Sequence, residues 1–258
     1  MNTRPDPWVE TGGVVVPIVD VKGQSDQRVV PVWSFGLAGV LTEWDWGQGS
    51  PDVRSLESVR LVRSSTYSRN VPVHAFSMTT DTVLTLESGL EHVLLMLLDR
   101  QPDISWLVAQ PMLLWWSKKL RHYPDLLAME TDGTVTVWDA RPAELQDIDF
   151  NHKAELTSTA CQERGWRYET FGGLSQTAEV NLRWLATARR PPAWLDAARA
   201  LLLEQSGGRD FALGDVVRDD GDPYAVSTLW HLAWSGEVAL DLEAHWDAGT
   251  MVSWKQGA

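Results

Sequence analysis

The distribution of apolar residues along the chain predicts a mixed α/β fold. Residues 93–99 are apolar on most sides of a helix, which indicates a buried helix. Residues 108–116 have the composition of a strand. Two further β-forming runs, 126–130 and 134–138, flank Thr131-Asp132-Gly133, and an Asp-Gly step between such runs predicts a β-hairpin.

The length of the hairpin loop decides which residues face one another. A three-residue loop ending in Gly133 pairs Glu130 with Thr134 and places Asp125 directly opposite Asp139, on the same face. A two-residue loop would put the two aspartates on opposite faces. We favour the three-residue loop, because glycine suits its left-handed position.

Paired aspartates on one face repel each other and weaken a sheet, and a divalent cation would convert that cost into a binding site. Arg141 shares the face of Asp139, two residues further along. Glu91 lies one turn into the buried helix, at the edge of its apolar face, and buried carboxylates are uncommon without a partner or a metal. These residues form a candidate acidic triad with a cation. In the alternative interpretation, Asp125 caps a strand and Asp139 faces solvent.

Further helices and a strand are expected after the hairpin. A helix is expected at 150–164, a strand at 167–171 and a helix at 178–188, followed by the linker Arg189-Arg190-Pro191-Pro192. Residues 1–59 contain strand-like pieces and are interpreted as a β-rich extension or a partner-docking segment without chemistry of its own. The pieces are 14–16 and 29–33.

The C-terminal part predicts three helices followed by a β-hairpin, which is the plan of a winged helix. The helices are expected at 192–205, 211–217 and 222–234, and the strands at 236–242 and 250–254. Only His231 is a basic candidate for exposure on the third helix, so we expect this module to contact protein rather than read bases.

The net charge of −13 argues against autonomous DNA binding. Residues 1–75, 76–185 and 186–258 carry −1, −7 and −5, so no region is basic. A local basic cluster, Lys118, Lys119, Arg121 and His122, is expected on the turn leading to Asp125, where it could contact phosphates that flank a cut. The alternative is a solvated hairpin tip. We therefore expect partners to deliver this chain to DNA.

Composition excludes other classes of protein. The single cysteine, Cys161, excludes an internal disulfide and a Cys-rich zinc site. The absence of HxH or HExxH spacing disfavours zinc ligation by histidines, so His122 is expected to orient a phosphate or a carboxylate. No apolar stretch reaches membrane-spanning length and no signal peptide is evident, so we expect a soluble, cytoplasmic protein with no membrane partner.

Four short motifs occur in one order: Ser88-x-Leu90-Glu91, Gln110-Pro111, His122-x-Pro124-Asp125 and Asp139-x-Arg141. In this order and spacing, over about residues 60–185, the chain resembles the TnsA family, the endonuclease subunits of heteromeric cut-and-paste transposases. The likeness is to the divergent TnsA-like branch, in which Asp-x-Arg-Pro precedes a helix that ends near Gly-Trp-Arg-Tyr. Here these sequences stand at 139–142 and 165–168.

The resemblance implies a restriction-endonuclease-like core of the PD-(D/E)xK type at 60–188, a mixed sheet flanked by helices, with the winged helix at 192–258. It implies Mg²⁺-dependent hydrolysis of a DNA phosphodiester at transposon ends, with Mn²⁺ as a substitute. Glu91, Asp125 and Asp139 would supply the carboxylate ligands that Mg²⁺ prefers. The implied partners are DNA, a DDE-type transposase subunit and an AAA+ ATPase regulator.

One position departs from the family, because Arg141 stands where the motif has lysine. Arg141 could act as an electrostatic clamp on phosphate, since arginine is a poor proton carrier. Lys153 could instead reach in from the following helix, or it could be an ordinary exposed lysine. In a third interpretation, the change leaves a DNA-binding subunit with weak or no cleavage.

Two other functions are compatible with the sequence. One is a free-standing restriction or repair nuclease with the same core, and the other is a structural subunit that bridges the transposase and its ATPase regulator. On the simple repulsion argument, removing Asp125 or Asp139 should preserve or slightly raise stability.

Overall fold

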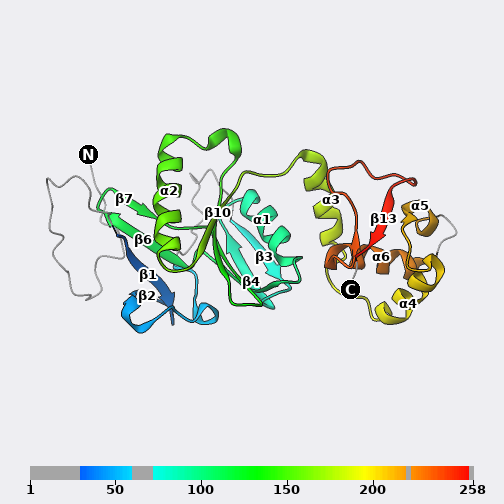
Figure 1. Cartoon of the computed structure of the whole chain (residues 1–258), viewed down its shortest axis with the longest axis horizontal. Coiled ribbons are helices and arrows are strands. Elements are labelled where there is room, and N and C mark those ends of the chain that lie inside the picture. Colours follow the sequence, from blue (N-terminus) through cyan, green and yellow to red (C-terminus); the bar gives the residue numbers. More distant parts are fainter. Residues whose placement is uncertain (1–29, 60–71, 219–221, 256–258) are drawn as a thin grey trace. The chain divides into compact units, whose positions relative to one another are not determined.

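The computed structural model describes residues 30–59, 72–218 and 222–255, and Figure 1 shows their strands and helices. Pro31–Ala258 forms one unit, to which the following description applies. The strand-like piece predicted at 14–16 and the first residue of the one at 29–33 lie outside the described residues.

The predicted hairpin belongs to a four-stranded mixed sheet with the order β10-β9-β8-β5. Its strands are β5 (Ile104–Ala109), β8 (Leu126–Glu130), β9 (Val135–Ala140) and β10 (Arg167–Phe171). β8 runs antiparallel to β5 and β9, whereas β10 is parallel to β9. A parallel pair needs a crossover connection, which α2 (Ile148–Gln162) supplies.

Helices pack against both faces of this sheet. α1 (Gly89–Asp99) shares a hydrophobic cluster with Leu126 and Ala128, whereas α2 shares another with Leu127 and Val137. Because successive residues of a strand point to opposite faces, α1 and α2 cover opposite sides. The mixed α/β class predicted from the sequence is confirmed.

A second four-stranded sheet has the order β2-β1-β6-β7 and is antiparallel throughout. Its strands are β1 (Val32–Leu37), β2 (Val40–Glu43), β6 (Met112–Ser117) and β7 (Leu120–His122). The prediction of one strand over 108–116 was wrong, because β5 and β6 belong to different sheets. Gln110 adopts a φ of +46° and Pro111 has no N–H to donate, so the ladder cannot continue through them.

Residues 31–59 pack into the same hydrophobic cluster as α2. Trp33 and Phe35 of β1 are buried, and their rings lie 5.7 and 6.1 Å from the ring of Trp166, at steep interplanar angles. Aromatic pairs with this edge-to-face geometry add to the burial of their area. Two short 3₁₀ helices, η1 (Trp46–Gln48) and η2 (Val53–Ser55), complete this region. These residues belong to the segment predicted as a β-rich N-terminal extension.

A separate hairpin of β3 (Val73–Ser77) and β4 (Thr82–Leu86) packs beside α1. The buried carboxylate of Asp99, the last residue of α1, accepts hydrogen bonds from the Ser77 hydroxyl (2.6 Å) and from the Met78 and Thr79 N–H groups (2.9 Å each). These donors satisfy a charge that would otherwise be costly to bury.

The helix predicted at 178–188 is α3 (Gln176–Ala186). The helices and strands predicted for the C-terminal part follow in the predicted order. They are α4 (Leu195–Ser206), α5 (Leu213–Val216), α6 (Pro223–Ser235), β12 (Val238–Ala239) and β13 (Met251–Trp254). One element was missed, the two-residue strand β11 (Phe211–Ala212), which pairs with β13 and gives the sheet order β11-β13-β12.

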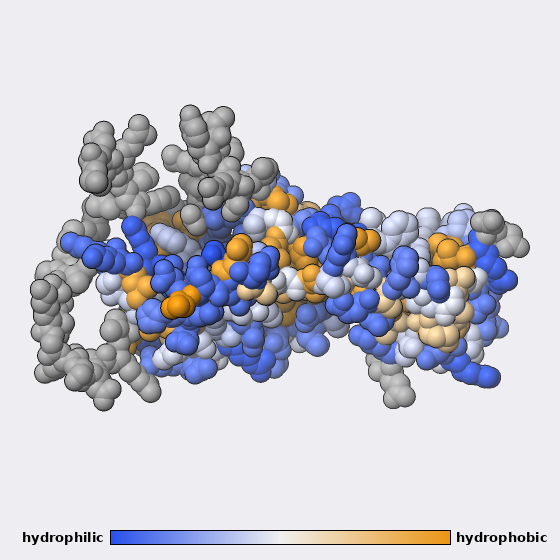
Figure 2. All heavy atoms as spheres, turned by 90° about the horizontal axis from the view of Figure 1, so that it is seen from above, coloured by the Kyte–Doolittle hydropathy of each residue, from blue (hydrophilic) through white to orange (hydrophobic). Residues whose placement is uncertain are grey.

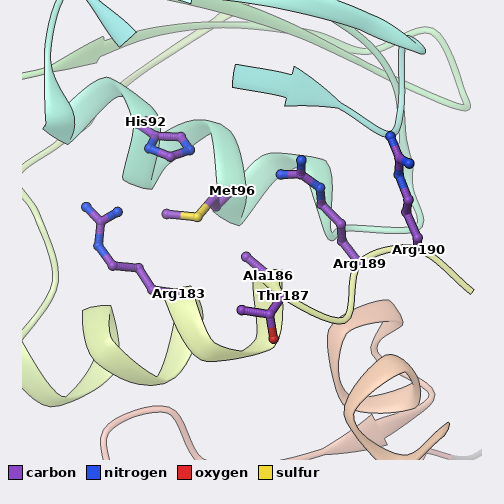
Figure 3. A pocket seen from close by; sticks show the side chains of 7 residues that line it. All are labelled: His92, Met96, Arg183, Ala186, Thr187, Arg189 and Arg190. Carbon is purple, nitrogen blue, oxygen red and sulfur yellow. The ribbon is translucent and has the colours of Figure 1, made fainter. Parts of the chain in front are cut away.

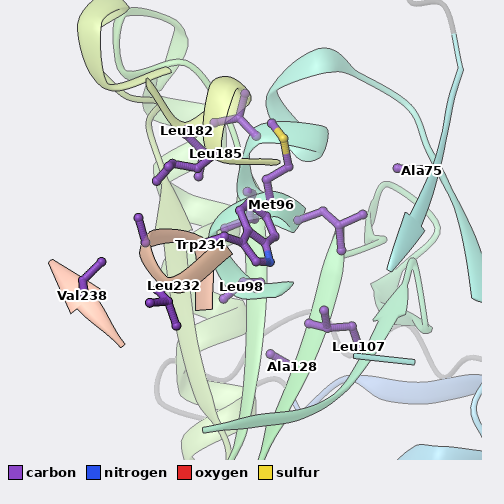
Figure 4. Close-up of a cluster of buried hydrophobic side chains, with 14 of the residues drawn as sticks. Ala75, Met96, Leu98, Leu107, Ala128, Leu182, Leu185, Leu232, Trp234 and Val238 are labelled. Carbon is purple, nitrogen blue, oxygen red and sulfur yellow. The ribbon is translucent and has the colours of Figure 1, made fainter. Parts of the chain in front are cut away.

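The expectation that His231 is exposed on the third helix of this module was wrong. His231 is buried in α6, and its Nδ1 lies 2.9 Å from the carbonyl oxygen of Ala188, just beyond α3. α3 and α6 pack together, and Figure 4 shows side chains of both helices beside those of α1, β5 and β8 in one cluster. The apolar periodicity of α6 identified its helical character but not how much of its surface its neighbours cover.

None of the helices in the described ranges is long and apolar enough to cross a membrane. On the face seen in Figure 2, hydrophilic residues predominate and hydrophobic ones occur as small patches among them. Isolated exposed apolar side chains of this kind are normal on folded proteins.

We predict that Gly36→Ala destabilises the fold by about 1–3 kcal/mol, the usual cost of overpacking. A Cβ at Gly36 would lie 2.2 Å from the carbonyl oxygen of Glu57. The two backbones are held together because the Glu57 N–H donates a hydrogen bond of 2.9 Å to the Gly36 carbonyl. The matched control is Gly89→Ala, where a Cβ meets nothing within 4 Å. Urea denaturation followed by tryptophan fluorescence measures both, and equal midpoints for the two variants would contradict the packing described here.

Candidate active site at the open end of the hairpin

The register of β8 and β9 is the one expected from a three-residue loop. Leu126 pairs with Trp138, the Glu130 N–H donates to the Thr134 carbonyl (2.8 Å), and Gly133 has a φ of +87°. Continuing this ladder beyond β8 places Asp125 opposite Asp139. The prediction of a three-residue loop is therefore confirmed, and the two-residue alternative is excluded.

Asp125 lies at the margin of the sheet, immediately before β8. Its N–H donates to the Trp138 carbonyl (3.0 Å), and its carbonyl accepts from the Gln110 N–H (2.8 Å). The Oδ2 atom of its side chain accepts from the N–H of Ala140 at 2.7 Å. These bonds fix both the backbone and the carboxylate of Asp125 at the end of the hairpin.

Burial holds the pKa of Asp125 well above its usual range, and the negative charges of Asp139, Glu91 and Glu87 add to the effect. The hydrogen bond from Ala140 acts in the opposite sense but does not overcome them. A cation beside Asp125 would reverse this balance, because an opposite charge favours the ionised carboxyl.

Asp139 is almost fully buried, with 2% of its surface exposed. Its Oδ2 lies 2.6 Å from Nε2 of His122 and accepts a hydrogen bond from the Tyr168 hydroxyl. Of the two roles expected for His122, the structure therefore shows carboxylate orientation. Burial and the adjacent Asp139 charge raise the pKa of Tyr168, so this hydroxyl stays a neutral donor.

Glu91 is buried near the start of α1, as its position on the predicted helix indicated. Its carboxylate accepts from the Glu87 N–H and from the Ser88 hydroxyl, both at 2.8 Å. Ser88 in turn accepts from the Glu91 N–H at 3.2 Å, so the two side chains cap the helix reciprocally.

The three acids do not meet on one face of the sheet. Asp139 shares the face of Val137, which packs toward α2. Burial, and then the charge of Asp139, raise the pKa of Cys161 on that helix. α1, which carries Glu91, covers the opposite face. Asp125 lies at the margin of the sheet, where the charges of both Asp139 and Glu91 raise its pKa.

This geometry limits what the acids can hold. Within the described ranges, no three His, Cys, Asp or Glu side chains gather closely enough to form a metal site. Asp125 and Asp139 are nevertheless an opposed pair, and Mg²⁺ is commonly bound through one or two carboxylates plus substrate phosphates and water. The chemistry of this pair fits such a cation, whereas a three-carboxylate cage is not formed.

Gln110 adds a second observation next to Asp125. It is 1% exposed, its backbone lies in the left-handed region, and its side-chain oxygen has no hydrogen-bond partner among the described residues. Backbone strain and an unsatisfied buried oxygen are costly, and an ion or water is a common explanation for such an atom.

The two candidate cations lie on or before α2. The Arg141 Nε donates to the Leu145 carbonyl (2.9 Å) in the short helix η3 (Ala143–Leu145), and its guanidinium lies 3.7 Å from the Asp147 carboxylate. Among the described residues, the ion pair of Arg141 is with Asp147 rather than with Asp125 or Asp139. Lys153 lies on α2, on the face of the sheet toward which Asp139 points.

The basic cluster divides between a turn and a strand. Lys118 and Lys119 occupy the turn between β6 and β7, as predicted, and are exposed. Arg121 lies on β7 with its surface exposed, whereas His122, at the end of that strand, turns to Asp139. The lysines therefore lie at a hairpin tip, and His122 contacts Asp139.

Two functional residues were missed by the sequence reasoning. Tyr168 was noted only as part of the Gly-Trp-Arg-Tyr sequence, and Glu87 was given no role. The parallel register pairs Tyr168 with Val137 and so places it on the face of Asp139. Periodicity gives the position of β10, but it does not give its register against β9.

Removing Asp139 has a different consequence from the one expected from charge repulsion alone. Its loss would leave the His122 and Tyr168 groups without their acceptor, and an unsatisfied buried donor costs about 1–3 kcal/mol. The simple expectation of preserved or raised stability thus applies to Asp125 but not to Asp139.

We predict that Asp125→Asn is more stable than the wild type at neutral pH. The raised pKa means that the contribution of this carboxyl to stability is fully present below its ordinary pKa of 3.8 and is lost as pH rises through the folded-state value. Asparagine does not ionise and keeps that contribution. Urea denaturation across this pH range should therefore show the variant gaining on the wild type as pH rises.

The matched control is Asp132→Asn at the exposed hairpin tip. A hydrogen bond from the Thr134 N–H lowers the pKa of Asp132, so its contribution has the opposite pH dependence and should be small. If Asp125→Asn followed the same pH dependence as Asp132→Asn, the electrostatic description of Asp125 would be wrong.

No protein-family model matches the chain, and no curated protein matches it either. Of the three acids singled out in the sequence, the fold brings Asp125 and Asp139 to the open end of the hairpin, whereas Glu91 lies on α1.

Proposed function

We propose that this chain is a metal-dependent DNA endonuclease, the subunit of a heteromeric cut-and-paste transposase that cleaves a phosphodiester at transposon ends. The observation that carries the proposal is the register of β8 and β9, which sets Asp125 opposite Asp139. These residues belong to two of the four motifs on which the family resemblance depends, and the pairing was expected from the loop alone.

The surrounding architecture supports a restriction-endonuclease-like core. In chain order, α1, β5, β8, β9, α2 and β10 build a mixed sheet with a helix on each face, and the acids lie at the end of the middle strands. The order α4, β11, α5, α6, β12 and β13 supports the winged-helix interpretation of the C-terminal part. The burial of His231 in α6 favours a protein-contacting role for that module.

In the proposed site, Asp125 and Asp139 would hold Mg²⁺ or Mn²⁺, with Glu91 adding negative charge from the other face. When bound, the cation supplies Lewis-acid stabilisation of the phosphate and activates water. His122 and Tyr168 hold the Asp139 carboxylate in place. Gln110, whose backbone N–H donates to the Asp125 carbonyl, has a buried and unsatisfied side-chain oxygen that is a further possible acceptor. The chain thus provides a fixed carboxylate, a second one with a raised pKa, and a buried neutral oxygen.

The acidic balance of the chain favours delivery to DNA by partners. A net charge of −13 opposes association with a polyanion, and the exposed Lys118 and Lys119 provide only a local exception. A DDE-type transposase subunit and an AAA+ ATPase regulator are the proposed partners. This sequence contains no phosphate-binding glycine-rich loop, so any ATP dependence would come from the regulator.

A non-catalytic subunit that bridges the transposase and its regulator is the second candidate. The observation that favours it is the bonding of Arg141 to Leu145 and Asp147, which leaves the acidic pair without a directly bonded arginine. In that case the acids would be a structural remnant.

We predict that Mn²⁺ binds the wild type and not Asp125→Asn, as measured by titration calorimetry without DNA. With the partner subunits and a transposon-end substrate, the same variant should lose cleavage by at least about 100-fold, the upper range for disturbing groups around a metal. Asp132→Asn should bind Mn²⁺ and cleave like the wild type. Full cleavage by Asp125→Asn would exclude it from the catalytic site and favour the bridging role.

A separate comparison identifies the working cation. If Arg141 acts on the phosphate, Arg141→Lys should retain cleavage because the charge is kept, and Lys153→Ala should be neutral. If Lys153 acts instead, Lys153→Ala should lose cleavage by about 100–10,000-fold. The measurement is the single-turnover cleavage rate with partners present. Wild-type rates for both Arg141→Ala and Lys153→Ala would show that neither residue serves the reaction.

A further inference from the structure

A solvent-open cavity of about 430 Å³ is lined by residues of α1, of α3 and of the chain that follows α3. Its lining includes His92, Met96, Arg183, Ala186, Arg189 and Arg190. Figure 3 shows the side chains of Arg183 and Arg189 extending toward α1 from positions on either side of Met96. Cavities of roughly 300–1,000 Å³ are typical of small-molecule and cofactor sites.

The positive charge of this cavity contrasts with the acidic chain around it. Arg183 is paired with Glu179 on its own helix (2.8 Å), and Arg190 lies 5.5 Å from the ring centroid of Phe76. Arg189 and Arg190 form no ion pair with an acidic side chain in the part of the chain that the structure describes. Arg189 and Arg190 therefore line the cavity without a neutralising carboxylate, whereas Arg183 is paired with Glu179.

Three arginines and a histidine line this one cavity: Arg183, Arg189, Arg190 and His92. In Figure 3 the side chain of His92 lies on α1, on the side of the cavity that Arg183 and Arg189 approach. Like charges around one cavity repel each other, and a bound anion would relieve this repulsion.

The chemistry of the lining favours phosphate over other anions. Guanidinium groups present forked N–H donors that match phosphate oxygens bidentately. Met96 is buried, and with Ala186 it provides an apolar part of the lining. The arginines come from a helix and from the segment after it, so they approach an occupant from more than one direction.

We propose that this cavity is a phosphate-binding site, in which Arg183 and Arg189 grip a phosphate group and His92 hydrogen-bonds to it. The phosphate belongs to the DNA backbone or to a free phosphorylated small molecule. The site is separate from the Asp125–Asp139 pair, requires no metal, and stands whether or not the chain cleaves DNA.

The test measures binding by the full chain in EDTA, so that no metal contributes. The first probe is inorganic phosphate, detected as a rise in thermal midpoint relative to chloride at equal ionic strength. The second probe is a short fluorescein-labelled DNA duplex, detected by fluorescence anisotropy. Arg183→Gln and Arg189→Gln should each weaken binding by about tenfold or more, because each removes a charge-assisted hydrogen bond.

The matched control is Arg209→Gln, which removes the same charge from an exposed residue outside the cavity. Arg183→Lys keeps the charge but loses the fork, and should weaken binding by less than Arg183→Gln. Thermal midpoints without phosphate establish that each variant is folded. If Arg183→Gln unfolds because Glu179 loses its partner, Arg189→Gln decides the question.

Loss of both probes in the cavity variants supports a site for phosphate from either source. Loss of DNA binding alone assigns the DNA backbone, and loss of the phosphate effect alone assigns a free phosphorylated molecule. The proposal is overturned if neither probe binds the wild type, or if Arg209→Gln weakens binding as much as the cavity variants do.

Discussion

The hydrogen-bonded register of β8 and β9 is the constraint on which the site depends. Gly133 takes the left-handed conformation that closes a three-residue loop, and every pair along the ladder follows from that loop. A shift of one residue would move Asp139 to the face that α1 covers, away from His122 and Tyr168. The chemistry at the open end of the hairpin is therefore set by backbone geometry at its closed end.

The buried carboxylates of Asp125, Asp139 and Glu91 have different hydrogen-bond partners, and this explains why the three do not form one metal-binding cage. Asp139 and Glu91 are satisfied by protein donors on opposite sides of the sheet, whereas Asp125 receives one backbone hydrogen bond and the repulsion of its neighbours. Asp125 is thus the carboxylate whose state responds most to an added cation. Between α1 and α3 the sign of the charge is reversed. Arg183, Arg189 and Arg190 line one cavity there, and a bound anion would relieve the repulsion between their positive charges.

Much of the fold could be predicted because its signals are local. Apolar periodicity located α1, α2, β8, β9 and β10, and turn chemistry fixed the hairpin register. The break between β5 and β6 was missed, because a glutamine gives no local sign that it will adopt a positive φ. The burial of His231 was missed because it depends on the packing of α6 against α3.

The sequence by itself determined most of the elements around the site, the pairing of Asp125 with Asp139 and the position of Glu91 on a buried helix, since each follows from a period or from a short turn. Only the tertiary structure decided that α1 and α2 cover opposite faces, that Tyr168 and His122 hold Asp139, and that Arg183 and Arg189 line one cavity. These contacts join segments far apart in the chain, and they depend on how whole helices and sheets pack, which no local pattern specifies.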